Sequence, residues 1–334
     1  MRGSSLQLPP VGLGLWKSRP GEVGEAIKVA LACGYRLLDG AAAYSNEKEV
    51  GDALADCLRD GVVARGEVFV VSKLFNTHHV WHDDRSRPAA ALATTLADLR
   101  LSYLDLYLMH WPVAFEQTEL ASIGGLRLKD GTPNPKLVME FEYVETWREM
   151  LQMKRQGKVR HLGVCNFNVE MLEKLMAEFP DDFPEVNQVE LHPYLAQPEL
   201  VSFCRQHGIK LMAYSPLGSA DSYSGASFPA RGTGRFACPH GGSPLLQNEL
   251  VAEIAARHKL TPAQVLVAWS VKEGFCCLPK SVNPSRIAQN LAGASFSLDE
   301  KDMERLKALD CDFRYGIGYQ PGFFDCPNAP WFTG

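Results

Sequence analysis

The chain has few of the features that place a protein in a membrane, in a secretory pathway or on nucleic acid. No apolar run in its 334 residues approaches the ~18 residues of a transmembrane helix. The stretch 1–12 lacks the apolar core of a signal peptide. A formal net charge of −5 gives no positive field for nucleic acid or anionic lipid. We therefore expect a cytoplasmic protein that binds neither nucleic acid nor membrane.

The sequence also lacks the cysteine pairs of redox and zinc motifs. Its nine cysteines stand singly apart from the adjacent Cys276 and Cys277, and no CxxC pattern occurs. This favours reduced thiols. The polar stretch HHVWHDD at 78–84 is spaced too irregularly for a metal site. We predict a solvated surface turn there and no bound metal.

Short apolar runs alternate with longer amphipathic segments, and no Pro-, Ser- or Gly-rich linker divides the pattern into halves. The runs expected to form strands are 11–16, 35–40, 67–74, 105–111, 159–167, 186–192, 209–216 and 275–281. The segments with a helical pattern are 20–34, 46–61, 87–101, 144–157, 168–179, 197–208 and 261–274. Such alternation predicts a parallel sheet covered by helices, and eight strands can close a barrel. We therefore predict an α/β fold, a single (β/α)8 TIM barrel over 1–334.

Two connections and the end of the chain depart from this rhythm. The long loops 113–140 and 217–246 follow the fourth and seventh predicted strands, on the face where barrel enzymes carry their chemistry. Loops of this length are often functional, and we expect the second to gate release of product or cofactor. The tail 311–334 either covers the same face or packs against the barrel exterior.

Four polar residues lie at or just after the ends of predicted strands, namely Asp39, Tyr44, Lys73 and His110. A nearby ammonium stabilises a phenolate, so Lys73 is expected to lower the pKa of Tyr44 from its ordinary value of about 10. Asp39 would keep a buried lysine charged, and His110 is suited to donate a hydrogen bond to a carbonyl oxygen. The set contains no good nucleophile, which favours carbonyl reduction with a hydride from a cofactor.

Two stretches are candidates for binding that cofactor. GLGLW at 12–16 is an incomplete dinucleotide fingerprint, because it lacks the third glycine and the later acidic residue. LPKSVNPSRIAQN at 278–290 places a lysine at a strand end, a Ser-Val-Asn turn and an arginine in the first turn of a helix. These groups form a compact anion site, unless they are only the solvated basic start of a helix.

Several of these motifs together resemble those of the aldo-keto reductase superfamily, in particular aldose and aldehyde reductases. The matching stretches are LLDGAAAYSNEKEVG, VSKL, LDLYLMHWP, GVCNF, NQVELHPY and LPKSVNPSRIAQN. The resemblance implies that Asp39, Tyr44, Lys73 and His110 form the catalytic tetrad, with Tyr44 as the general acid. Family members that reduce a steroid carbon–carbon double bond carry glutamate at the position of His110, so the histidine indicates carbonyl reduction.

The resemblance also implies NADPH/NADP+ as the cofactor. The positions matching contacts to the 2′-phosphate, which would select NADPH over NADH, are Lys280, Ser281, Asn283 and Arg286, with Gln289 and Asn290 near the adenine. The positions matching contacts to the nicotinamide are Asn166, Gln188 and Tyr214, and those matching the pyrophosphate loop are Ser215, Leu217 and Ser219. A salt link between Lys17 and Asp221 would close over the pyrophosphate. Cys165 replaces the usual serine, and a thiol is a weaker hydrogen-bond partner.

The substrate pocket is expected to have walls of Trp16, Ala43, Phe75 and Trp111. Aromatic walls around a polar floor suit aldehydes with apolar or aromatic bodies, and open-chain sugars. We expect a monomeric NADPH-dependent enzyme that reduces aldehydes and some ketones to alcohols. Two alternatives stay open: an NAD-linked polyol or alcohol dehydrogenase of the same fold, and a non-catalytic NADPH-binding regulatory module.

Overall fold

Eight strands lie side by side in the order of the sequence and are all parallel. The computed structural model describes residues 6–80, 84–115, 142–218 and 244–315. The strands are β1 (Leu13–Gly14), β2 (Leu37–Asp39), β3 (Phe69–Leu74), β4 (Leu104–Met109), β5 (Val159–Cys165), β6 (Val186–Glu190), β7 (Lys210–Tyr214) and β8 (Cys276–Leu278). Parallel bridges Val11–Cys277 and Gly14–Lys280 join the first strand to the last. The sheet therefore forms a barrel, and the predicted (β/α)8 barrel fold is confirmed.

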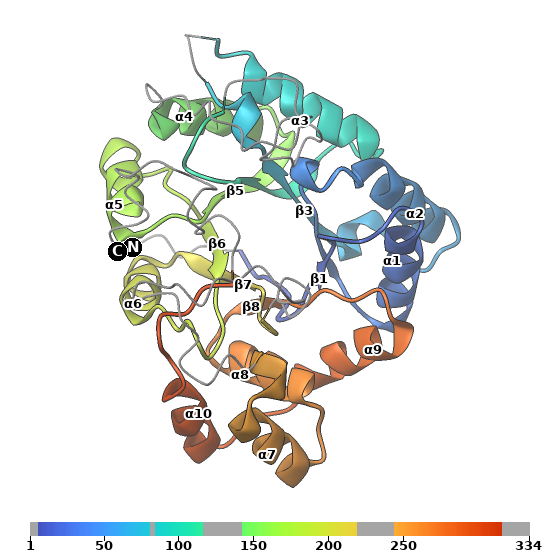
Figure 1. Cartoon of the computed structure of the whole chain (residues 1–334). Helices are drawn as coiled ribbons and strands as arrows, with labels where there is room; N and C mark the ends of the chain where they lie inside the picture. The colour runs from blue at the N-terminus through green and yellow to red at the C-terminus, as the bar shows by residue number, and fades with distance from the viewer. Residues whose placement is uncertain (1–5, 81–83, 116–141, 219–243, 316–334) are drawn as a thin grey trace, which may run out of the picture.

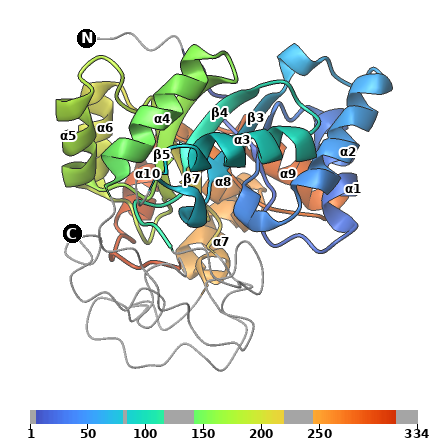
Figure 2. The same ribbon diagram turned by 90° about the horizontal axis from the view of Figure 1, so that it is seen from above.

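The helices form a ring around the strands (Figure 1), and Figure 2 shows the same barrel from above. They are α1 (Glu22–Cys33), α2 (Glu47–Arg59), α3 (Arg87–Asp98), α4 (Tyr143–Arg155), α5 (Val169–Glu178), α6 (Pro198–His207), α7 (Glu249–His258), α8 (Pro262–Lys272), α9 (Pro284–Gly293) and α10 (Glu300–Lys307). Short 3-10 turns η1 (Ala42–Tyr44), η2 (Arg65–Glu67), η3 (Asn76–His78) and η5 (Leu245–Gln247) lie in the connections. None of the helices in the described ranges is long and apolar enough to cross a membrane.

Two apolar cores hold the barrel together. The smaller fills the space inside the strands and consists of Leu37, Val71, Leu106, Leu108, Val186, Met212, Cys276 and Leu278, with Leu6 from the N-terminal segment. The larger lies between the strands and the helices and includes Trp147 and Trp269. Both faces of every strand are thus covered, which is why the strands read as nearly continuous apolar runs.

Local signals set the start of α8 and α9, the helices before and after β8. Thr261 and Gln264 form a capping box at α8, and the side chain of Asn283 accepts the main-chain N–H of Arg286 at α9. The sequence patterns missed α7 and α10. The first directly follows the Gly-, Ser- and Pro-rich loop 217–246, although its buried Val251, Ile254 and Ala255 have helical spacing. The second is short and has the highly charged sequence EKDMERLK.

The prediction of a solvated turn at 78–84 is wrong for the two histidines that open the stretch. His79 is fully buried and His78 is half-buried, whereas Asp84 is exposed. The ring Nδ1 of His79 lies 3.3 Å from the hydroxyl of Thr146 on α4. Burial lowers the pKa of His79 to about 3, so the imidazole is neutral. Packing of this connection under α4 overrides its polar composition. Residues 81–83 lie outside the described ranges.

Candidate active site

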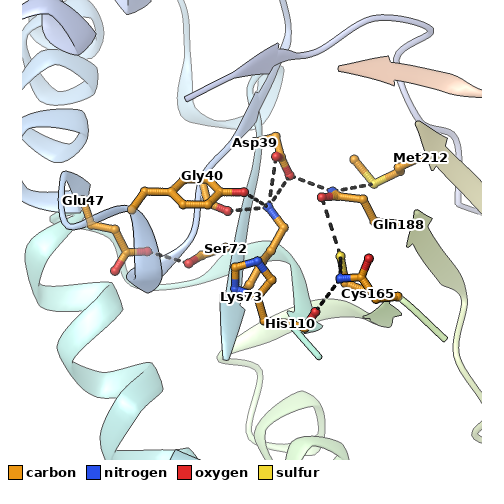
Figure 3. A network of polar contacts seen from close by, with 11 residues as sticks. Asp39, Gly40, Glu47, Ser72, Lys73, His110, Cys165, Gln188 and Met212 are labelled. Carbon is orange, nitrogen blue, oxygen red and sulfur yellow. Dashed lines mark hydrogen bonds and ion pairs between the residues drawn. The ribbon is translucent and has the colours of Figure 1, made fainter. Parts of the chain in front are cut away.

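The barrel brings the four predicted polar residues together at the carboxyl ends of its strands. Asp39 is the last residue of β2, Lys73 lies in β3, His110 follows β4, and Tyr44 ends the η1 turn after β2. The Lys73 ammonium lies 2.8 and 3.0 Å from the two Asp39 carboxylate oxygens and 2.9 Å from the Gly40 carbonyl oxygen. It also lies 3.2 Å from the Tyr44 hydroxyl. Figure 3 shows these contacts converging on the lysine nitrogen.

The charge on Lys73 is set by a balance between burial and its neighbours. The side chain is completely buried, and burial by itself would lower the pKa of Lys73. The negative charge of Asp39 is the largest upward contribution, and together with Tyr44, Cys165 and the hydrogen bond to Asp39 it outweighs burial, so the net shift of the lysine pKa is upward. Lys73 is therefore a fixed cation next to the tyrosine hydroxyl.

The pKa of Tyr44 is raised rather than lowered, contrary to the expectation from the sequence. Burial raises the pKa of Tyr44 more than the ammonium of Lys73 lowers it, and the charge of Asp39 also raises it. The phenol consequently keeps its proton at neutral pH. Lys73 acts in the predicted direction, but desolvation of the phenolate is the larger effect at this depth.

His110 is a neutral hydrogen-bond donor in this environment. Burial and then the charge of Lys73 hold its pKa well below the usual range. Its Nδ1 atom is buried and has no hydrogen-bond partner among the described residues, while part of the side chain is accessible. A proton on Nδ1 would be a buried donor without an acceptor. The proton therefore belongs on Nε2.

Two amide side chains connect the predicted nicotinamide site to the tetrad. Gln188 on β6 donates to a carboxylate oxygen of Asp39 at 2.8 Å, and Asn166 after β5 donates to the main-chain oxygen of His110 at 3.0 Å. The Tyr214 hydroxyl donates to the side-chain oxygen of Asn166 at 2.8 Å. The thiol of Cys165 lies 3.9 Å from the Gln188 oxygen. Each of the two amides therefore holds one tetrad residue in place.

The predicted anion site lies at the start of α9. Asn283 and Arg286 are exposed, Lys280 is half-buried, and Ser281 is buried, with its hydroxyl accepting the Asn283 N–H at 3.1 Å. The ammonium of Lys280 lies 3.2 Å from the carbonyl oxygen of Lys17. Two accessible cations at a helix N-terminus suit a phosphate group.

The remaining predicted cofactor residues are distributed around these two clusters. Asn290 is buried, Gln289 is exposed, and Ser215 and Leu217 are half-buried after β7. Lys17 lies over the ring of Trp16, with its nitrogen 4.4 Å from the ring centroid. Ser219 and Asp221 lie outside the described residues, as do most of the loops 113–140 and 217–246 and residues 316–334 of the tail.

Aromatic rings surround His110 and Tyr44. The ring centroid of Phe75 lies 6.2 Å from that of His110, and the ring of Trp111 stacks beside His110 at 6.4 Å. Trp16 is 40% exposed and lies 6.5 Å from Tyr44, with Ala43 half-buried in the η1 turn. Sequence reasoning missed Phe115, whose ring lies 6.4 Å from Phe75.

A buried carboxylate beside the site was also missed. Glu47 opens α2, and its two oxygens accept hydrogen bonds from Ser72 at 2.5 Å and from Thr95 on α3 at 3.0 Å. Ser72 directly precedes Lys73 on β3, so this network ties the lysine strand to two helices. Figure 3 shows the contact between Glu47 and Ser72. The position of Glu47, three residues after Tyr44, lies within the stretch LLDGAAAYSNEKEVG that carries the family resemblance.

A parallel barrel that holds a tyrosine, a buried lysine–aspartate pair and a neutral histidine at one mouth belongs to the class of barrel oxidoreductases. Residues 10–310 match the model of the Aldo/keto reductase family. The chain is 42% identical over 311 residues to aldo-keto reductase family 1 member A1 of Mus musculus, covering 92% of this chain and 88% of that protein. It is 41% identical over 308 residues to aldose reductase B of Dictyostelium discoideum, covering 92% and 90%.

Solved structures agree with the sequence comparisons. The aldose reductase of Schistosoma japonicum superposes with a TM-score of 0.80 at 31% identity, covering 98% of both chains. An aldo-keto reductase of Bombyx mori, solved in complex with NADP, superposes with a TM-score of 0.77 at 30% identity, covering 93% of this chain and 92% of that one. The chain belongs to the aldo/keto reductase family.

Proposed function

We propose that this protein is an NADP-dependent oxidoreductase that reduces aldehydes, and some ketones, to primary and secondary alcohols with NADPH. The observation that carries the proposal is the contact of the Tyr44 hydroxyl, at 3.2 Å, with a fully buried ammonium that Asp39 holds in place. A proton donor backed by a fixed cation is what protonation of a developing alkoxide needs. The Aldo/keto reductase family assignment supports the same chemistry in general.

Each tetrad residue has a separate task in this mechanism. Tyr44 holds its proton until negative charge develops on the substrate oxygen and then transfers it from its hydroxyl. Lys73 stabilises the phenolate that remains, and Asp39 keeps Lys73 charged and oriented. His110 donates from Nε2 to the same oxygen and fixes the orientation of the carbonyl. The dihydronicotinamide, when bound, supplies the hydride.

The residues around the tetrad suit NADPH. The side chains of Asn166 and Gln188 present amides to a carboxamide, and the half-buried ring of Tyr214 offers an aromatic face beside them. Lys280, Ser281, Asn283 and Arg286 present positive charge and hydrogen-bond donors to a 2′-phosphate. This cluster favours NADPH over the NAD-linked alternative, because NADH has no group that would use it.

The aromatic side chains suggest the substrate class. Trp16, Phe75 and Trp111 surround the donors with apolar surface. A small aldehyde with an apolar or aromatic body buries that surface while its oxygen reaches Tyr44 and His110. We propose that the protein acts on such substrates as a monomer in the cytoplasm.

The test is consumption of NADPH with a panel of aldehydes, comparing the wild type with Tyr44→Phe. The variant removes the transferable proton and keeps the ring. We expect turnover by the wild type and a fall of about 10²- to 10⁴-fold in kcat for the variant, with NADPH binding unchanged. NADPH binding without turnover by the wild type would instead favour a regulatory module. Preferred turnover with NAD+ and alcohols would favour the dehydrogenase.

A further inference from the structure

The end of the described chain packs against the loop that leaves β7. Tyr315 is only 1% exposed, and a Cβ atom added at Gly218 would come within 3.0 Å of its ring. Gly218 has a φ of +69° and donates its N–H to the carbonyl oxygen of Ser215 at 2.9 Å. The segment 215–218, which we call the β7 turn, is therefore a hydrogen-bonded turn, and its last residue packs against the ring of Tyr315.

The hydroxyl of Tyr315 reaches a second segment. It accepts the main-chain N–H of Leu245 at 3.0 Å, and Leu245 is completely buried. Leu245 opens the η5 turn that precedes α7. One side chain thus contacts the β7 turn with its ring and the chain before α7 with its hydroxyl.

The main chain of Tyr315 is itself anchored to the end of β6. Its N–H donates to a carboxylate oxygen of Glu190 at 2.5 Å. The same oxygen lies 2.9 Å from Nε2 of His192, and both side chains are buried. The ring of His192 also meets Tyr315 edge-on, with the centroids 5.2 Å apart. A buried acceptor held in this way leaves the tyrosine little freedom to shift.

We propose that Tyr315 is a positioning residue for the cofactor, which supports the β7 turn from behind and so sets the place of Ser215 and Leu217. This inference rests on the proposed function, since those two residues are expected to contact the pyrophosphate of NADPH. The ring fills the space behind a glycine at which a Cβ atom would be crowded and the positive φ would be strained, and the hydroxyl satisfies a buried N–H that would otherwise lose its partner.

The experiment compares three variants of the full chain. Tyr315→Phe removes the hydroxyl and keeps the ring, and Gly218→Ala places a methyl group against the ring at a positive φ. Tyr194→Phe is the matched control, because Tyr194 is equally buried and its hydroxyl accepts from Asn248, three residues after Leu245. The measurements are the Kd of NADPH from nicotinamide fluorescence, kcat and KM for an aldehyde, and the unfolding free energy.

We expect the Kd of NADPH to rise about threefold to tenfold in Tyr315→Phe and by at least as much in Gly218→Ala. The control should lose stability with its Kd within about twofold of the wild type. The KM for the aldehyde should stay unchanged in all three, because the tetrad lies elsewhere. Equal Kd values in Tyr315→Phe, Gly218→Ala and the wild type would overturn the inference, as would an equal rise in the Tyr194→Phe control. A wild type that does not bind NADPH would overturn the proposed function itself.

Discussion

Replacing Lys73 with methionine should lower the free energy of unfolding by about 3–5 kcal/mol, the usual effect of removing one partner of a buried ion pair. Lys73 is fully buried and is held by both Asp39 oxygens and by the Gly40 carbonyl oxygen. The Asp39 side chain is 4% exposed, so Lys73→Met leaves a buried carboxylate that has lost its ammonium partner and keeps the hydrogen bond from Gln188. One amide donor does not compensate a buried charge.

The double variant Asp39→Asn with Lys73→Met separates the charge from the packing. It removes both charges from the same site, and a neutral site of similar volume is often as stable as the ion pair. We expect the double variant to recover at least about 2 kcal/mol of what Lys73→Met loses. Both variants should lose activity, since neither keeps the cation beside Tyr44.

Urea unfolding, followed by tryptophan fluorescence, measures the two free energies. NADPH binding on the same samples shows whether the barrel is intact. A loss below about 1 kcal/mol in Lys73→Met, or a double variant less stable than the single one, would refute the argument that Asp39 and Lys73 stabilise each other as a buried pair.

Two further predictions concern charges outside the tetrad. Arg286→Ala should weaken NADPH binding by about tenfold to a hundredfold, the loss expected for a charge-assisted contact, and should leave the affinity for NADH unchanged. The control is Arg305→Ala, which breaks an exposed pair with Glu253. Equal effects of Arg286→Ala on both cofactors would contradict the 2′-phosphate site. Glu185 lies 2.6 Å from Lys154 and 2.8 Å from His161, and although burial opposes them these partners lower its pKa to about 2. Its stabilising effect is present above its ordinary pKa of about 4.3 and is lost as the pH falls toward about 2. On acidification the free energy of unfolding should therefore fall less in Glu185→Gln than in the wild type. An equal fall in the two proteins would count against the pairing.

Most of the fold, and the grouping of the tetrad residues at one mouth of the barrel, could be predicted from the order of residues. Eight apolar runs separated by amphipathic segments admit few arrangements other than a parallel barrel. In a parallel barrel all strand ends with the same direction meet at one mouth. Asp39, Lys73 and His110 were therefore expected to lie close together, although no local pattern brings them into contact.

The order of residues thus specifies which chemical groups the site contains and the face on which they gather. The electrostatic state of these groups and the residues that support them depend on how the chain folds. The rise in the Tyr44 pKa depends on how deeply the closed barrel buries the phenol. The bond between Gln188 and Asp39 joins residues 149 positions apart. The contact of Tyr315 with Gly218 likewise arises where the chain returns to the mouth. Burial and long-range partners depend on how the elements pack, and a sequence pattern carries only the local part of that information.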